Sequence, residues 1–460
     1  MKKYIATLVA GVALLGGCKD STGVPDFNNP SYQDLLAKPL TTVTLQNLIT
    51  GLVDQERAAL GTAPATYIVF PEVLARDAYR TDQSEPRYVN EFLNGTPDPG
   101  AFSGNGAYLV FTRDIRAANT LLSLIPSAAP TELTDAQKSA TRGFTRTMKA
   151  LDVYHLVETR DTLGVPIDVD KPLGDALAPI VCKPKVLGYI SALLDSGLAD
   201  LQAGGTAFPF KLPPGFAGFT NPSTTFAQFN RGLKGKIELY RALDHTTPTG
   251  ASGFNAAITA LNQSFINSTD VSKITTGVYY TFSIATGDRI NPLVDGNLHL
   301  NPQISDSLQA GDARGAKIVT LANPSTIQGV TYKSNFAATQ IQPIAMLKNE
   351  ELVLLRAQAK VGLNDFAGAT ADVNYVRSAW GLAPVAEFTT FKEAIGRILW
   401  EKRYSLLFES AHRLVDLRAY GWLNNNFFKK ELPGDVFVKA LPHPQNEADQ
   451  RQGNLAVSCS

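Results

Sequence analysis

The sequence predicts a mainly α-helical protein built from tetratricopeptide-like helix pairs, with long irregular loops and a few short strands. Two stretches carry this prediction. Along 398–422, large apolar residues recur at helical spacing and form a stripe wide enough to be buried, and Gly421 follows as a C-terminal stop. Apolar spacing in 346–361 and 366–377 predicts two helices joined by a short turn, a unit of roughly the 34 residues of a tetratricopeptide-like repeat.

Helical spacing predicts further helices along the rest of the chain. They are expected near 45–61, 69–80, 107–125, 138–159, 186–201, 226–243 and 254–267. Thr134 and Gln137 have the pattern of a capping box before the 138–159 helix. Between 268 and 342 helical spacing fades, and short β-branched runs at 278–282 and 317–321 predict two small strands in a mostly irregular segment.

Length and charge limit the possible organisation. The 460 residues would allow about three domains by length alone. We expect a single unit over 41–460, because the helices of 340–454 must pack against the earlier ones. Lys+Arg and Asp+Glu both number 42, so the formal net charge is zero, and there is no basic run. This balance does not indicate a nucleic-acid partner.

The N-terminus has the pattern of a bacterial lipoprotein signal. Two lysines precede an apolar run that is too short to span a bilayer, and Leu-Gly-Gly-Cys follows. We therefore expect a signal peptide over 1–17, acylation of Cys18, and a polar tether over 18–40 that leads from the membrane to the fold. The alternative is a soluble secretory signal with an incidental cysteine.

Two cysteines remain when Cys18 carries lipid. An exported protein lies in an oxidising compartment, so Cys182 and Cys459 are candidates for a disulfide that would fasten the C-terminal tail to the body. The alternative is two separate thiols.

Charged residues accompany the apolar stripe of 398–422. They are Glu401, Arg403, Glu409, Arg413, Asp416 and Arg418. One interpretation is a solvated helix edge with weak exposed pairs. The other is a partly buried structural ion network. Eight residues separate Glu401 from Glu409, about 12 Å along a helix. Because glycosidase carboxylates lie roughly 5–9.5 Å apart, these two are not an acid/base pair.

This same stretch resembles the C-terminal signature of the SusD/RagB family of outer-membrane nutrient-uptake lipoproteins. The matching positions are Glu401, Arg403, Phe408, Glu409, Arg413, Asp416, Leu417, Arg418 and Gly421. Ser405 stands where the family usually has Glu, and Ser410 where it has Gly. The 351–377 segment resembles the helix pair that precedes the signature in this family. In the tail, His443 replaces the usual Ile and Arg451 the usual Asn.

The resemblance implies a non-enzymatic protein without a cofactor, folded as a right-handed superhelix of helix pairs. It would be anchored by lipid at the outer membrane, exposed at the cell surface, and capture an oligosaccharide or a peptide. The sequence leaves open which leaflet holds the lipid. It would pass this cargo to a TonB-dependent SusC-like β-barrel transporter. Two alternatives are a helical-repeat scaffold lipoprotein for outer-membrane assembly and an all-helical glycosidase.

Sequence motifs for catalysis and metal binding are absent, including H-E-x-x-H, G-x-S-x-G and paired C-x-x-C. We therefore predict no metal site, although calcium in the loop 288–295 stays open. Sugars bind to aromatic faces flanked by polar groups, and such mixtures occur in loop-rich segments near 76–108, 203–225 and 268–342. The candidate ligand contacts are Arg76, Asp77, Tyr79, Arg80, Tyr88, Phe92, Tyr279 and Tyr280. For any single one, packing within the loops is the alternative.

Overall fold

The computed structural model describes most of the chain from residue 34 onward. The described residues are 34, 36–61, 67–80, 84–172, 174–244, 250–327, 329–424 and 434–459. The predicted signal peptide, Cys18 and most of the 18–40 tether lie outside them. Within the described segments, no helix combines the length and the apolar character needed to cross a membrane.

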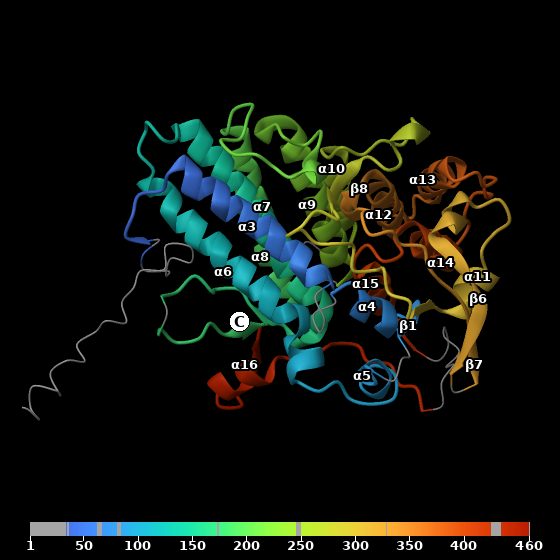
Figure 1. Ribbon diagram of the computed structural model, residues 1–460. Coiled ribbons are helices and arrows are strands. Elements are labelled where there is room, and N and C mark those ends of the chain that lie inside the picture. Colours follow the sequence, from blue (N-terminus) through green and yellow to red (C-terminus); the bar gives the residue numbers. More distant parts are fainter. Residues whose placement is uncertain are drawn as a thin grey trace, which may run out of the picture.

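Nine long helices follow one another through the described residues, and each packs against the next (Figure 1). In order they are α3 (Thr42–Gly61), α6 (Gly106–Leu124), α7 (Asp135–Arg160), α8 (Lys183–Gln202), α9 (Ala227–Leu243), α10 (Gly250–Asn262), α12 (Asn349–Gly362), α13 (Phe366–Ala379) and α14 (Phe391–Ser405). This arrangement confirms the prediction of a mainly helical fold. Its order in space follows its order in sequence, so each helix buries its apolar stripe against its neighbours.

The α7–α8 pair shows why the sequence permits close packing. Thr134 and Gln137 form the predicted capping box, so α7 begins at Asp135. A Cβ atom added at Gly143 would lie 2.9 Å from the carbonyl oxygen of Gly197 on α8. Glycine at this position therefore allows the two helix backbones to approach each other.

Short strands form three small sheets. The first has the order β1–β5–β7–β6, the second β2–β3–β9, and the third β4–β8. Their bounds are β1 (Ala78–Arg80), β2 (Val165–Pro166), β3 (Ile180–Val181), β4 (Gly277–Tyr280), β5 (Leu298–Leu300), β6 (Ile318–Ile327), β7 (Val330–Phe336), β8 (Ile344–Lys348) and β9 (Val457–Ser458). Short helices α4 (Val69–Leu74), α5 (Arg87–Asn90), α11 (Pro302–Asp306), α15 (His412–Ala419) and α16 (Gln445–Gln450) complete the regular elements.

The predicted helix at 69–80 is corrected by the structure. The helix α4 ends at Leu74, and Arg76 has a positive φ of 62° that turns the chain into β1. There Tyr79 lies opposite His299 of β5. Apolar spacing alone could not show this turn, because the pairing partner lies more than two hundred residues away in the sequence.

Cys182 and Cys459 form a disulfide with their Cα atoms 5.2 Å apart. The bond continues the parallel pairing of β3 with β9, and the Cys182 amide donates to the Ser458 carbonyl oxygen at 2.9 Å. The C-terminal tail is thus fastened next to the first turn of α8.

The stretch 398–422 is two helices rather than one. The helix α14 ends at Ser405, Phe408 has a positive φ of 58°, and α15 begins at His412. The Ser405 carbonyl oxygen accepts hydrogen bonds from Lys317 at 2.6 Å and Lys348 at 2.9 Å. These two ammonium groups satisfy the end of α14 in place of a further helical turn.

All six charged residues of this stretch pair with other elements, so they are not a solvated helix edge. Glu401 contacts Arg314 at 2.7 Å and Arg377 at 2.6 Å. Glu409 contacts Lys348 at 2.5 Å. Glu409 forms ion pairs with Lys317 and Lys348 because it precedes α15 and is not on its surface.

The remaining four residues connect α14 and α15 to each other and to distant parts of the chain. Arg403 and Arg413 contact the same oxygen of Asp77, at 2.8 and 2.9 Å. The Asp416 carboxylate forms an ion pair with the Lys402 ammonium group at 2.6 Å. Arg418 donates to the Glu158 carbonyl oxygen at the end of α7.

We expect Asp77→Asn to lower the free energy of unfolding by about 3–5 kcal/mol, because it removes the buried carboxylate that two guanidinium groups contact. The matched control is Lys333→Gln in an exposed pair with Asp306 at 3.4 Å, which we expect to cost about 0–1 kcal/mol. Guanidinium denaturation measures both variants. Equal small losses would show that the buried pairs do not stabilise the fold.

Candidate ligand-binding site

Most of the predicted ligand contacts lie in the protein core. Arg76, Asp77, Tyr79, Tyr88, Phe92 and Tyr280 are each exposed by 3% or less. Side chains this deeply buried do not present a surface to a ligand. The predicted ligand face at these six positions is therefore corrected to a packing role.

Four of these side chains have partners that explain their burial. Tyr88 and Phe92 belong to an aromatic cluster with Phe70 and Phe102, whose ring centroids lie 4.9–5.9 Å apart. Asp77 holds the arginines of α14 and α15, and the Arg76 guanidinium donates to the Val436 carbonyl oxygen at 2.5 Å.

Arg80 is partly exposed, but its charge is engaged. Its guanidinium lies 3.5 Å from the Asp295 carboxylate and 5.3 Å from the centre of the Tyr88 ring. It belongs to the packing of β1 against the neighbouring loop.

Tyr279 is the predicted contact that reaches an open surface. It lines a hollow of about 520 Å³ where the 214–219 loop, the first turn of α9, and the 275–281 segment meet. Two of the three loop segments expected to form the ligand face thus converge here, those near 203–225 and 268–342. The third segment, 76–108, contributes no lining residue to this hollow.

Aromatic packing holds the loop that forms one wall. Phe216 is fully buried, with its ring centroid 6.3 Å from that of Phe226 and 6.4 Å from that of Phe229. A Cβ atom at the adjacent Gly215 would lie 1.8 Å from the Tyr279 carbonyl oxygen. Only glycine therefore lets this loop lie directly against β4, and the loop and the strand form one wall.

The hollow combines aromatic rings with uncharged polar groups. Phe219 and Phe265 pack edge to face with centroids 4.8 Å apart, and Tyr279 lies in the same wall. Thr225, Gln228, Thr275, Thr276 and Thr281 supply hydroxyl and amide groups. Burial raises the pKa of Tyr279 to about 12, and its hydroxyl donates to the Thr275 carbonyl oxygen, so the ring is neutral and fixed. No charged side chain is among the lining residues.

A second hollow, of about 350 Å³, lies against α14 and has a different character. It includes Trp400, Arg397 and Glu393. The Arg397 guanidinium lies 5.2 Å from the centre of the Trp400 ring, so it occupies a face on which a ligand would otherwise stack. The first hollow offers its aromatic rings without such a competitor.

Sequence reasoning found Tyr279 and two of the loop segments, but it missed other lining residues. Phe265 follows α10 and Gln228 lies in the first turn of α9, and both were assigned to helices. Strand alternation is the sequence pattern that separates Tyr279 from Tyr280, since successive side chains of β4 point to opposite faces.

Comparison with known proteins supports the fold. No model of a known protein family matches the sequence. No curated protein matches it either. Among solved structures, a SusD-like carbohydrate binding protein from Bacteroides vulgatus is 16% identical over 83% of each chain, with a TM-score of 0.59.

Two further structures cover more of the chain. NanU from Bacteroides fragilis is 14% identical, over 95% of this chain and 98% of its own, with a TM-score of 0.65. Surface glycan-binding protein A from Bacteroides uniformis is 15% identical, over 90% and 98%, with a TM-score of 0.64. The chain therefore has the SusD-like fold, which confirms the fold that the signature at 401–421 implied.

Proposed function

We propose that this protein binds a neutral oligosaccharide in the hollow beside Tyr279 and takes part in nutrient uptake. The observation that carries the proposal is the lining itself, in which three aromatic rings stand among threonine hydroxyls and one glutamine amide. Aromatic faces cover the C–H surfaces of a sugar, and the polar groups orient its hydroxyls. The volume of about 520 Å³ falls within the range of roughly 300–1,000 Å³ for ligand pockets.

The absence of charge from the hollow favours a saccharide over a peptide. A bound peptide brings charged termini or side chains, and a buried charge needs a partner of opposite sign. The lining residues of this hollow provide none. A neutral glycan needs only hydrogen bonds and apolar contact, which the threonines and aromatic rings offer.

The same lining supports binding without hydrolysis. Glycosidases use a pair of carboxyl groups on either side of the scissile bond. The hollow beside Tyr279 has no Asp or Glu among its lining residues, and the hollow beside Trp400 has Glu393 alone. We accordingly assign the protein no catalytic role.

The cellular setting is part of the proposal and has separate support. The lipoprotein pattern ending at Cys18 indicates a lipid anchor in a membrane, and the resemblance at 401–421 implies the outer membrane. Two of the solved structures of similar fold are named as carbohydrate- or glycan-binding proteins. A lipid-anchored binding protein of this fold would hand its cargo to a TonB-dependent SusC-like transporter. A helical scaffold for membrane assembly is the rival, and it would not need an aromatic hollow.

We expect Tyr279→Ala to weaken oligosaccharide binding at least tenfold, because it removes a ring against which the sugar packs, and about 1.4 kcal/mol corresponds to tenfold. Tyr279→Phe retains the ring and should keep most of the affinity. Isothermal titration calorimetry of the Cys18→Ser chain, with glycans first identified on an array, measures both variants.

The control for this binding experiment is Arg397→Ala in the second hollow, which we expect to leave affinity unchanged. A loss in Arg397→Ala without a loss in Tyr279→Ala would place the ligand beside Trp400 and contradict the assignment. Binding of peptides but of no glycan would contradict the proposed cargo.

We expect the wild-type protein, extracted in detergent from outer membranes, to co-purify with a large β-barrel transporter at near-equal amount. Mass spectrometry identifies the partner, and Cys18→Ser is the control because it removes the anchor. Recovery of assembly factors in place of a transporter would support the scaffold alternative.

A further inference from the structure

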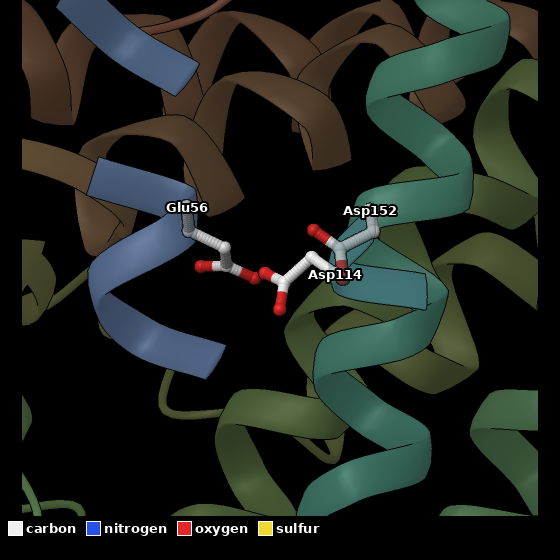
Figure 2. Close-up of side chains that lie close together, drawn as sticks. All are labelled: Glu56, Asp114 and Asp152. Atoms are coloured by element: carbon white, nitrogen blue, oxygen red, sulfur yellow. The ribbon is translucent and has the colours of Figure 1, made fainter. Parts of the chain in front are cut away.

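Three acidic side chains meet in the core, and none of them is among the lining residues of either hollow. Glu56 comes from α3, Asp114 from α6 and Asp152 from α7, and Figure 2 shows their carboxyl groups converging from the three helices. Each residue is exposed by only 1%. One oxygen from each lies within 4.8 Å of the others.

None of the six carboxyl oxygens has a hydrogen-bond partner of ordinary geometry among the described residues. The hydroxyl of Tyr280, on β4, faces the Glu56 carboxyl group and interacts with it, but it too lacks a hydrogen bond of ordinary geometry. Buried polar groups of folded proteins are nearly always satisfied, so seven oxygens without a well-formed hydrogen bond in one place indicate a missing partner.

No cationic side chain among the described residues supplies that partner. None of the described lysine, arginine or histidine side chains contributes to the electrostatics of Glu56, Asp114 or Asp152. Three carboxyl groups held together at this depth need a positively charged partner, either protons or a metal ion.

We propose that Glu56, Asp114 and Asp152 bind a divalent cation, with the Tyr280 hydroxyl at its side, and that this cation is calcium. The donors are all oxygen atoms, which suit hard cations and not zinc or copper. Ca²⁺ binds oxygen ligands at about 2.3–2.6 Å in flexible geometry, so oxygens that lie within 4.8 Å of one another can share one ion. Mg²⁺ demands near-ideal octahedral geometry and usually keeps several waters, for which a buried site is poorly suited.

The position of this site gives the cation a structural role. It joins α3, α6 and α7, and through Tyr280 it reaches β4, whose next residue toward the N-terminus lines the hollow. The neighbour of Glu56 reinforces the connection, because the Arg57 guanidinium donates to the Thr281 carbonyl oxygen at 2.7 Å. The inference of a cation does not depend on the proposed glycan.

The test begins with metal content and refolding of the full-length chain in detergent. Because the cluster is buried, the ion enters during folding, so the protein is unfolded in guanidinium with a chelator and refolded with Ca²⁺, with Mg²⁺ or with chelator alone. We expect one calcium per chain after refolding with Ca²⁺ and desalting, and a melting temperature several degrees above that of the chelator sample. Mg²⁺ alone should give a smaller shift.

Variants locate the ion. Glu56→Gln with Asp114→Asn should reduce bound calcium at least tenfold and abolish the calcium-dependent shift in melting temperature. Glu72→Gln is the matched control, since Glu72 is equally buried but accepts a hydrogen bond from the Phe408 amide at 2.9 Å. Calcium retained by the double variant would place the ion elsewhere, such as the 288–295 loop, and overturn the proposal.

If the double variant fails to fold, the wild-type chain and the single variant Tyr280→Phe test the site instead. Refolding in Tb³⁺, a calcium substitute whose emission is excited by nearby tyrosine, should give luminescence that falls at least several-fold in Tyr280→Phe. No bound metal and equal melting temperatures in Ca²⁺ and chelator would show that the three acids are protonated, which also overturns the proposal.

Discussion

The shared contact of Arg403 and Arg413 with Asp77 is the interaction on which the rest of the architecture depends. A charge removed from water is tolerated only beside an opposite charge or a set of hydrogen bonds. Arg403 and Asp77 are 326 positions apart, so their pairing fixes α14 against the turn that follows α4. Glu401 does the same for the 312–317 segment through Arg314. The C-terminal helices thus complete a core begun near the N-terminus.

The same requirement shapes the surface on which a ligand can bind. Because the six charged residues between Glu401 and Arg418 find partners inside the fold, they are not available to a ligand. The hollow beside Tyr279 is built differently, from a loop held by Phe216 and a strand in direct contact with Gly215. Aromatic packing makes its wall rigid, and its lining is uncharged. A protein with zero formal net charge and an uncharged hollow is suited to a cargo that is itself neutral.

The sequence was a good guide wherever structure depends on near neighbours. Apolar spacing located most of the long helices to within about five residues, although it placed the start of α14 seven residues too late. The Thr134–Gln137 capping box fixed the start of α7. It failed where a distant residue decides. The break after Ser405 depends on Lys317 and Lys348, and the burial of Arg76 and Asp77 depends on partners beyond residue 400. Composition alone does not tell an aromatic residue that lines an open hollow, such as Tyr279, from one that faces the core, such as Tyr280.

Two sets of buried acids show how one physical rule leads to two different conclusions. Glu401 is as buried as Glu56, but two arginines contact its carboxylate, and the set is complete within the chain. Glu56, Asp114 and Asp152 are buried on three helices, and no cationic side chain of the described residues contributes to their electrostatics. A lone acid on an apolar stripe is the sequence signal for such a site. Three such acids indicate a cation site only when the fold brings their helices together. Since the fold supplies a counter-charge for its other clustered acids, the absence of one here indicates that the counter-charge comes from solution.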